Sequence, residues 1–240
     1  MRTLVVLPTY DEAANISEVL RRLREACPDV AVLVVDDNSP DGTAEIAEEV
    51  GAEIGDVDVL RRPGKSGLGS AYRDGVRYGL AHGFDVLVEM DSDLSHDPAA
   101  LPAILRGIED GADLVIGSRY VRGGSIPDWS WHRRALSKWG NRYAAAVLGF
   151  DVRDATSGYR AYRADAMAKI DFHTVRADGY GFQIEMAYRV LATGGTVVEV
   201  PISFIDRVRG TSKMSSRIVV EALVLVTWWG VRDRLLRFRR

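Results

Sequence analysis

Apolar runs alternate with helical spacing along the first part of the chain. The runs TLVVLP (3–8) and AVLVVDD (31–37) are continuous and rich in β-branched residues, which is typical of parallel strands covered on both faces. Between them, apolar residues repeat at helix spacing over 16–23, and Asn15 stands where an N-cap is expected. The pattern predicts a strand, a helix and a second strand.

The same alternation continues to about residue 120. It predicts helices over 41–50 and 67–83, and strands over 56–60, 85–91 and 113–119. A βαβαβ series of this kind forms a parallel, doubly wound sheet with helices on both faces. We therefore expect an α/β fold with a mostly parallel central sheet.

The last third has a different rhythm, but no linker, repeat or low-complexity segment separates it from the rest. It predicts helices over 131–149, 182–194 and 215–237, a strand over 157–163, and a strand pair over 196–207 that is interrupted at Pro201. We expect one α/β domain over residues 1–213, followed by an amphipathic, basic helical segment over 214–240.

Composition excludes several classes of protein. The 240 residues are 47% hydrophobic, enough for one globular domain with a real core. The net charge of −3 does not indicate a nucleic-acid partner. Cys27 is the single cysteine, so no internal disulfide forms, and the first residues lack the pattern of a signal peptide. These features favour a cytoplasmic protein.

Two zones are basic although the chain as a whole is acidic. Residues 119–142 hold six Arg or Lys against Asp128 alone, and residues 217–240 hold six Arg against two acids. Such zones indicate a local anionic partner, either phosphate or lipid head groups.

The apolar stretch over 218–231 is too short to span a bilayer. Its fourteen residues make a helix of roughly 21 Å, whereas a bilayer core measures about 30 Å. With Trp228, Trp229 and an arginine-rich tail, it fits a helix lying on the membrane surface. A core helix or a partner-binding helix is the alternative.

The acidic stretch VLVEMDSDLSHDP ends the strand predicted over 85–91. Asp91 and Asp93 alternate, so an extended chain directs both to one face, where two carboxylates suit Mg²⁺ or Mn²⁺. Asp97 before a proline is typical of a helix N-cap. Glu89 shares the face of Asp91, and its partner is open.

Polar stretches follow four predicted strands, at the edge where open α/β sheets bind ligands. They are PTYDE, DDNSPDG, RRPGKSG and EMDSD. Asp36 or Asp37 either contacts a base or ribose, or belongs to a turn and helix cap. The backbone of 67–69 offers N–H groups to an anion, although the spacing of a full phosphate loop is absent.

Seven motifs together resemble, in order and spacing, the dolichol-phosphate mannosyltransferase family, a subgroup of the family 2 GT-A glycosyltransferases. They are LPTYDEAANI, VVDDNSPDGT, GKSGLGSAYRDG, MDSDLSHDP, GSRYVRGG, TSGYRAY and GYGFQIEM, and the match as a whole runs from about Leu4 to Lys213. The resemblance implies a GT-A fold and inverting transfer of mannose from GDP-mannose to a polyprenyl phosphate. It also implies Mg²⁺ or Mn²⁺, and a peripheral position on the cytoplasmic membrane face, with a membrane partner subunit as a further candidate.

The resemblance also implies roles for individual residues. The catalytic set is Asp91, Asp93 and Arg207, and the metal ligands are Asp91, Asp93 and Ser95, which stands where relatives often have Gln. Contacts with the nucleotide sugar are implied for Pro8, Tyr10, Glu12, Asp37, Lys65, Met90, Ser92 and Glu185. Contacts with the lipid phosphate are implied for Arg119, Arg133, Arg134, Ser137 and Lys213.

Two alternatives remain open at this point. One is a polyprenyl-phosphate glucosyltransferase that uses UDP-glucose or another nucleotide sugar, because no residue names the base or the sugar on physical grounds. The other is a non-catalytic subunit that kept the fold. The intact acids Asp91 and Asp93 and the intact Arg207 argue against the second alternative.

Overall fold

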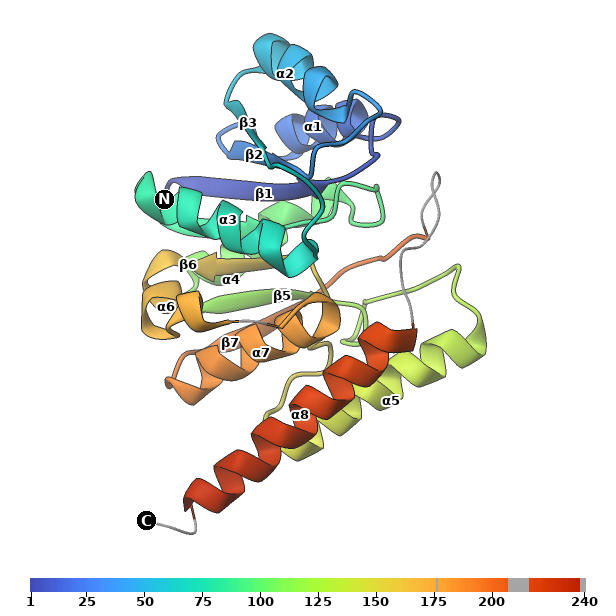
Figure 1. Ribbon diagram of the computed structural model, residues 1–240, viewed down its shortest axis with the longest axis vertical. Helices are drawn as coiled ribbons and strands as arrows, with labels where there is room; N and C mark the ends of the chain where they lie inside the picture. Colours follow the sequence, from blue (N-terminus) through green and yellow to red (C-terminus); the bar gives the residue numbers. More distant parts are fainter. Residues whose placement is uncertain (176, 207–215, 238–240) are drawn as a thin grey trace.

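Seven strands form one sheet in the computed structural model, which describes residues 1–175, 177–206 and 216–237 (Figure 1). The strands are β1 (Thr3–Thr9), β2 (Ala31–Asp36), β3 (Val57–Arg61), β4 (Val86–Glu89), β5 (Leu114–Ser118), β6 (Arg160–Arg163) and β7 (Val197–Pro201). Their order is β3-β2-β1-β4-β6-β5-β7, and β6 is antiparallel to both of its neighbours while the other pairs are parallel. Six strands therefore end at the same edge of the sheet, as the mostly parallel prediction requires.

Helices cover both faces of this sheet. They are α1 (Ile16–Ala26), α2 (Thr43–Ile54), α3 (Leu68–Ala81), α4 (Leu101–Glu109), α5 (Trp131–Leu148), α6 (Ala164–Lys169), α7 (Gly179–Ala192) and α8 (Ser216–Arg237), with 3₁₀ turns η1 (Pro98–Ala100) and η2 (Phe172–Thr174). Helices α1, α2 and α4 pack on one face, and α3, α6 and α7 on the other. The arrangement is the predicted α/β fold.

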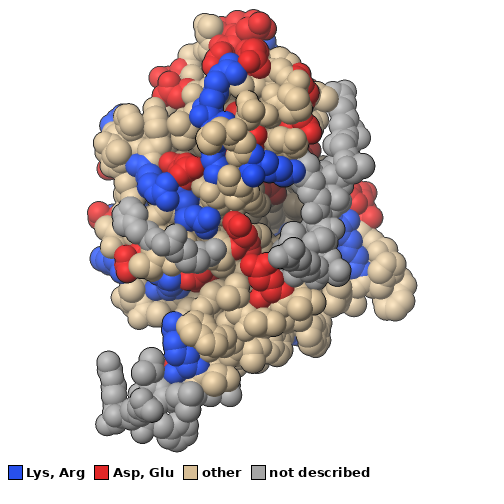
Figure 2. Space-filling model, in the orientation of Figure 1, with Lys and Arg blue, Asp and Glu red and all other residues tan. Residues whose placement is uncertain are grey.

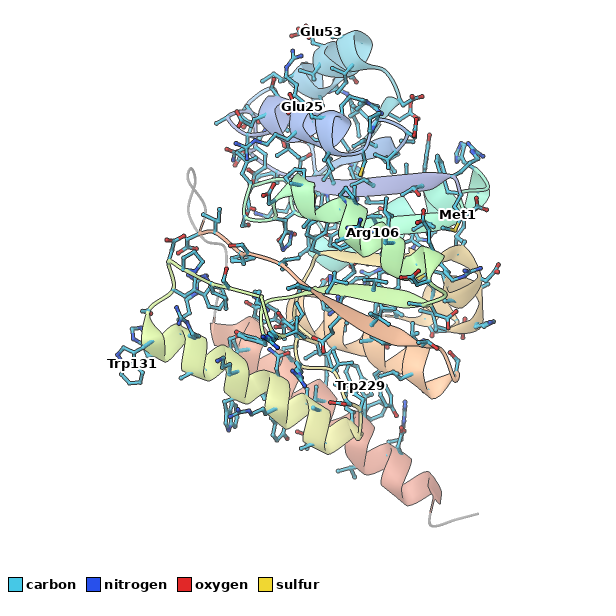
Figure 3. All side chains as sticks on the ribbon, turned by 180° about the vertical axis from the view of Figure 1, so that it is seen from behind. Met1, Glu25, Glu53, Arg106, Trp131 and Trp229 are labelled. Atoms are coloured by element: carbon cyan, nitrogen blue, oxygen red, sulfur yellow. The ribbon has the colours of Figure 1, made fainter. Side chains whose placement is uncertain are left out.

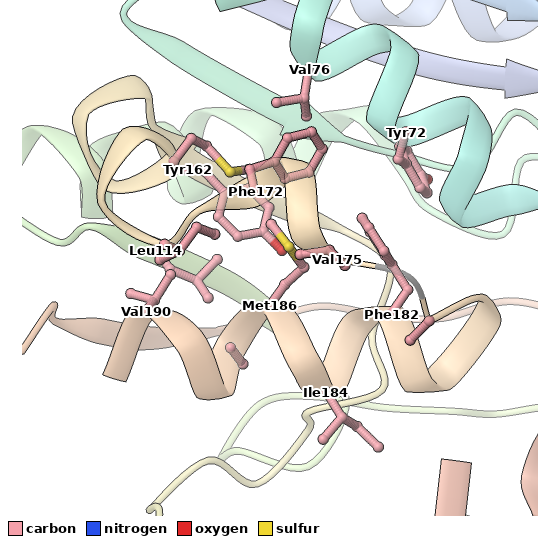
Figure 4. Close-up of a cluster of buried hydrophobic side chains, with 14 of the residues drawn as sticks. Tyr72, Val76, Leu114, Tyr162, Phe172, Val175, Phe182, Ile184, Met186 and Val190 are labelled. Atoms are coloured by element: carbon pink, nitrogen blue, oxygen red, sulfur yellow. The ribbon is translucent and has the colours of Figure 1, made fainter. Parts of the chain in front are cut away.

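Alternation along β1 builds the two cores. Leu4 and Val6 belong to one buried cluster and Val5 and Leu7 to the other, because successive strand residues point to opposite faces. Figure 4 shows part of the first cluster, where side chains of α3 and α7 meet those of β5 and β6. A run that is buried on both faces has no polar positions, which explains the continuous apolar stretches.

The C-terminal third departs from the predicted elements in three places. Helix α6 was not predicted, and β6 begins at Arg160 rather than at residue 157. Beyond Pro201 the expected second strand is reduced to isolated bridges at Ser203 and Phe204.

The terminal helix α8 lies against α5 and α7, on the side of the molecule away from β3 (Figures 1 and 3). Trp229 is buried and stacks on Tyr188 with ring centroids 6.5 Å apart, whereas Trp228 is 56% exposed. One side of α8 therefore packs into the protein core, and the other side faces outward. Among the described residues, no helix has the length and apolar composition needed to cross a membrane.

Substitution of Gly75 tests the close approach of α3 to β1. A Cβ at Gly75 would lie 2.3 Å from Cγ1 of Val6, so we expect Gly75→Ala to lower the free energy of unfolding by about 1–3 kcal/mol. Gly140 in α5 has no heavy atom within 4 Å of such a Cβ, so Gly140→Ala should be neutral or stabilise by about 0.5–1 kcal/mol. Urea unfolding of both variants measures the contrast, and equal effects would contradict the packing described.

Candidate active site

A cavity of about 670 Å³ opens at the edge where the parallel strands end. Its volume lies within the range that small-molecule sites of enzymes occupy. Eight residues predicted to contact the nucleotide sugar or the lipid phosphate line this cavity: Pro8, Tyr10, Glu12, Asp37, Lys65, Ser92, Arg119 and Arg133. Asp91, Asp93 and Ser95 line it as well. Residues from distant parts of the sequence therefore converge on one site.

The acid pair follows β4 directly. Asp91 has a partly exposed side chain, and its Oδ1 accepts a hydrogen bond of 3.2 Å from the hydroxyl of Tyr72. Asp93 is buried, and its Oδ1 accepts hydrogen bonds from the backbone N–H (3.0 Å) and the hydroxyl of Ser95. Ser95 thus orients Asp93 in this structure, and a role for it as a metal ligand stays a prediction.

The acids fit one kind of metal site. Among the described residues, no three His, Cys, Asp or Glu side chains gather closely enough to form a complete protein ligand set. Asp91 and Asp93 nevertheless both line the cavity. Such a pair suits a hard divalent cation that takes its remaining oxygen ligands from water and substrate phosphates.

Glu89 lies beneath this pair, and its partner is now clear. Its Oε2 accepts a hydrogen bond of 2.9 Å from the amide of Gln183, and Glu89 is 1% exposed. Burial raises the pKa of Glu89 to about 7, although nearby Arg160 and the Gln183 hydrogen bond act in the opposite direction. The carboxyl therefore belongs to a buried polar group behind the wall.

Arg160 is the fully buried centre of that polar group. Its guanidinium donates to the carbonyls of Ser157 (2.6 Å), Gln183 (2.6 Å) and Ala155 (2.7 Å). These bonds join the segment before β6 to the first turns of α7. Thr156 and Gly158 of that segment line the cavity as a result.

His96 was not predicted, yet it links several parts of the wall. Its Nδ1 accepts the backbone N–H of Asp91 at 3.2 Å, and its ring stacks on Tyr159 and meets the edge of Phe204. Burial lowers the pKa of His96, although Asp91 raises it. The ring is thus held as a neutral imidazole, with an accepting Nδ1 that places the proton on Nε2.

The side of the cavity predicted to hold the nucleoside is formed by β1, β2 and the loop before α3. Lys65 Nζ lies 4.2 Å from the centre of the Tyr10 ring, a cation–π contact. Asp37 forms a buried ion pair with Arg62, which also bonds the hydroxyl of Ser70 at 2.6 Å. Sequence reasoning missed Arg62, because nothing in RRPG distinguishes it from its neighbour Arg61.

Two of the residues predicted to contact the nucleotide sugar do not line the cavity. Met90 is fully buried in the apolar cluster under α1 and α4. Glu185 is buried and pairs with Arg189 on its own helix at 2.6 Å. The residues of α7 that line the cavity are instead Gly179, Tyr180 and Gln183. Contacts of Met90 and Glu185 with the nucleotide sugar remain predictions without geometric support here.

The glycine-led start of α3 already faces an anion from within the chain. The carboxylate of Asp178 lies at this turn, where the backbone N–H groups of Gly69 and Ser70 favour its charged form. Burial raises the pKa of Asp178, although Arg73 opposes the shift. The N–H groups predicted to bind an anion therefore join α3 to the start of α7, where Asp178 itself lines the cavity.

Arg119, one of the residues predicted to contact the lipid phosphate, is buried at 6% exposure. Its Nε and Nη2 donate to the two oxygens of Asp154 at 2.7 and 2.6 Å, and Nη2 also donates to Thr156 at 2.9 Å. Burial opposes ionisation of Asp154, but Arg119 outweighs it, so the pKa of Asp154 lies below its ordinary value. Both partners stay charged.

The packing of α5 directs its predicted lipid-phosphate residues to different surroundings. Arg133 lines the cavity and pairs with Asp206 at 3.1 Å, whereas Arg134 donates to the carbonyl of Ile126 at 2.8 Å. Ser137 lies one turn further along α5 and accepts the hydroxyl of Tyr120 at 2.7 Å. Of the two arginines that the sequence left open, Arg133 faces the cavity. Arg207 and Lys213 lie outside the described residues.

An apolar groove continues from the cavity between α5, α7 and α8. Trp129, Arg133, Thr156 and Tyr180 line both spaces, so the two are continuous. The groove walls are otherwise almost entirely apolar and include Leu136, Trp139, Tyr143, Val219, Leu223 and Val226. The polar cavity and the apolar groove therefore meet near the two arginines, Arg119 and Arg133.

Comparison with known proteins defines the class. The family described as glycosyl transferase family 2 matches residues 4–171, more than half of the chain. The chain belongs to this family. Its fold and the acid pair at the end of β4 are in keeping with that assignment.

Similar proteins of known function cover the chain almost completely. A polyprenol monophosphomannose synthase of Mycolicibacterium smegmatis is 48% identical over 99% of this chain and 90% of its own length. An undecaprenyl-phosphate mannosyltransferase of Micrococcus luteus is 50% identical over 98% of this chain and 96% of its own. A dolichol-phosphate mannosyltransferase of Pyrococcus furiosus is 35% identical over 99% of this chain and 67% of its own.

Solved structures agree on the fold. Glucosyl-3-phosphoglycerate synthase from Mycobacterium tuberculosis, in complex with Mn²⁺ and UDP-glucose, superposes with a TM-score of 0.69 over 95% of this chain and 77% of its own. The two sequences are 20% identical. At that identity the likeness concerns the GT-A-type fold and not the ligands.

The buried carboxyl of Glu89 makes stability depend on pH. Its pKa rises from 4.5 when unfolded to about 7 when folded, so the carboxyl opposes folding increasingly as the pH passes from 4.5 to 7. Glu89→Gln keeps an oxygen for Gln183 and removes the charge. We expect its free energy of unfolding to match the wild type near pH 4 and to exceed it by on the order of 2–3 kcal/mol at pH 8. Urea unfolding in EDTA measures this, and a pH-independent difference would contradict it.

Proposed function

We propose that the chain is a polyprenyl-phosphate mannosyltransferase that uses GDP-mannose and releases polyprenyl-phosphate-mannose. The observation that supports this most directly is the cavity itself, which has an acid pair on one part of its wall and two arginines where the apolar groove begins. An acid pair suits a metal-bound diphosphate, and arginine forks suit a phosphate acceptor. The names and full-length coverage of the similar mannosyltransferases support the sugar and the lipid class.

At the donor end, the residues of the chain bind and orient. Asp37, Tyr10 and Lys65 border the part of the cavity that suits a nucleoside. Asp91 and Asp93 would hold Mg²⁺ or Mn²⁺, which when bound neutralises charge on the leaving diphosphate. Tyr72 and Ser95 keep the two carboxylates in place through hydrogen bonds.

At the acceptor end, the reacting group needs little activation. A phosphate monoester is already anionic at neutral pH, so no strong general base is required for its attack on the sugar. What the site must supply is compensation for two anions brought close together. Arg119 and Arg133 do this because guanidinium groups remain charged and donate hydrogen bonds to phosphate oxygens.

The apolar groove and the outer faces of α5 and α8 suit the lipid end of the acceptor. Trp131, Trp139 and Trp228 are 80%, 52% and 56% exposed, and Figure 3 shows Trp131 pointing outward at the start of α5. Figure 2 shows few charged side chains on the described surface over α8 and α5. Exposed tryptophans on such a face are typical of contact with a membrane surface. We propose that the protein is peripheral and docks by this face.

Transfer assays with several nucleotide sugars test the donor. With farnesyl phosphate as a short acceptor, we expect product from GDP-mannose that requires Mg²⁺ or Mn²⁺ and disappears in EDTA. Asp91→Asn should lower kcat at least about a hundredfold while thermal unfolding stays cooperative. Transfer from UDP-glucose with none from GDP-mannose would overturn the proposed donor, and full activity of the variant would overturn the role of Asp91.

Flotation with phosphatidylglycerol vesicles tests the docking face. We expect the double variant Trp131→Ser, Trp139→Ser to bind vesicles at least about tenfold more weakly, because two interfacial indole rings are lost. Val198→Ser is the matched control, since Val198 is an exposed apolar residue (38%) on β7 rather than on α5 or α8. Equal binding by the double variant and the wild type would contradict the assignment.

A further inference from the structure

Each arginine at the junction of cavity and groove already has an aspartate partner, and the two ion pairs differ in burial and in hydrogen bonding. Arg119 pairs with Asp154, and Arg133 pairs with Asp206. Both arginines line the cavity, and so does Asp206, whereas Asp154 lies behind the wall. One partner is therefore part of the scaffold and the other is exposed to a ligand.

Asp154 is fixed from several directions. Its side chain is fully buried and accepts the backbone N–H of Arg119 at 2.9 Å in addition to both side-chain bonds. The backbone N–H of Asp154 donates to the carboxylate of Glu199 at 2.9 Å. A carboxylate with three charge-assisted or backbone bonds and no access to water cannot leave its arginine without a large cost.

This fixed pair sets the plane of the Arg119 guanidinium. Its Cζ lies 5.4 Å from the centre of the Trp129 ring and 5.5 Å from that of Phe204. Within the described residues, the hydrogen bonds of this guanidinium to Asp154 and Thr156 use Nε and Nη2. Nη1 is therefore the nitrogen of the fork that remains for a phosphate oxygen in the cavity.

The second pair is held much less firmly. The side chains of Arg133 and Asp206 are 31% and 45% exposed, and a single nitrogen, Nη1, serves both carboxylate oxygens at 3.3 and 3.1 Å. Arg133 also rests on the Trp129 ring, with Cζ 3.9 Å from its centre. The stacking holds the guanidinium in place when its partner changes, and a solvent-exposed pair of this kind exchanges readily.

We propose that the two aspartates have opposite effects on the acceptor: Asp154 is a positioning residue that orients Arg119, whereas Asp206 occupies Arg133 until the acceptor phosphate displaces it. The proposal rests on the proposed function, because it concerns the acceptor of that reaction. A phosphate monoester carries more charge than a carboxylate, so it displaces Asp206 where a weaker anion does not. Asp206 thereby helps select a phosphate acceptor.

Acceptor titrations of two charge-removing variants test the opposite signs. With farnesyl phosphate and saturating donor, we expect Asp206→Asn to lower the acceptor KM about threefold, because it removes an exposed competitor. Asp154→Asn should raise the acceptor KM at least about tenfold, because Arg119 loses its fixed plane. The donor KM should stay unchanged in both, and shifts of the acceptor KM in the same direction would overturn the proposal.

Two further variants serve as a charge control and as a second test of the positioning of Arg119. Glu109→Gln makes the same change of charge on the exposed end of α4 and should leave the acceptor KM unchanged. Thr156→Val removes the hydroxyl that Arg119 Nη2 contacts at 2.9 Å without burying an unpaired charge. It should raise the acceptor KM in the same direction as Asp154→Asn, and it decides the question if Asp154→Asn does not fold. An unchanged or lowered acceptor KM in Thr156→Val would count against positioning.

Direct binding separates failure of this proposal from failure of the proposed function. Calorimetric titration with farnesyl phosphate alone needs no donor and no turnover. We expect tighter binding to Asp206→Asn and weaker binding to Thr156→Val than to the wild type. A wild type that transfers sugar while both variants bind as tightly as it does would overturn the inference alone. A wild type that binds farnesyl phosphate but transfers no sugar would overturn the proposed function alone.

Discussion

The buried guanidinium of Arg160 is the interaction on which the rest of the site depends. An arginine cannot lose its charge in a protein, so a fully buried one must be given hydrogen-bond acceptors. Here three backbone carbonyls, from Ala155, Ser157 and Gln183, provide them. This fixes the segment before β6 against the start of α7, and that segment carries Asp154 and Thr156. The orientation of Arg119 thus rests on Arg160, although Arg160 itself does not touch the cavity.

The site has a division of charge that follows from the sheet. Parallel strands that end at one edge bring Asp37 and the Asp91–Asp93 pair to the same side of the cavity. The two arginines, Arg119 and Arg133, come instead from the end of β5 and from α5. In the proposed function, a diphosphate and a phosphate acceptor both carry negative charge, so their reaction needs positive charge on both sides. The acid pair would hold a divalent cation on one side, and the two arginines carry positive charge themselves on the other.

The terminal helix packs as a core helix on one side, and contact of its other side with a membrane surface stays a proposal. Trp229 is part of the core against α7, and a Cβ at Gly230 would lie 2.4 Å from Cγ1 of Val147 in α5, so α8 is packed tightly. Trp228, next to Trp229, is exposed together with Val224. A helix that is apolar on both sides can complete a protein core and still present a face to lipid.

The sequence by itself determined the buried strands, the polar segments at their ends and the position of the Asp91–Asp93 pair. These features depend on the local pattern of apolar and polar residues. Asp97 was likewise predicted as an N-cap, and it caps η1 by accepting the N–H of Ala99. Only the tertiary structure decided which side of each helix faces the cavity. Gln183 and Glu185 are roughly 200° apart around α7, and successive residues such as Arg133 and Arg134 differ by about 100°. The packing of the helix therefore selects one of each pair, and no local pattern contains that rotation.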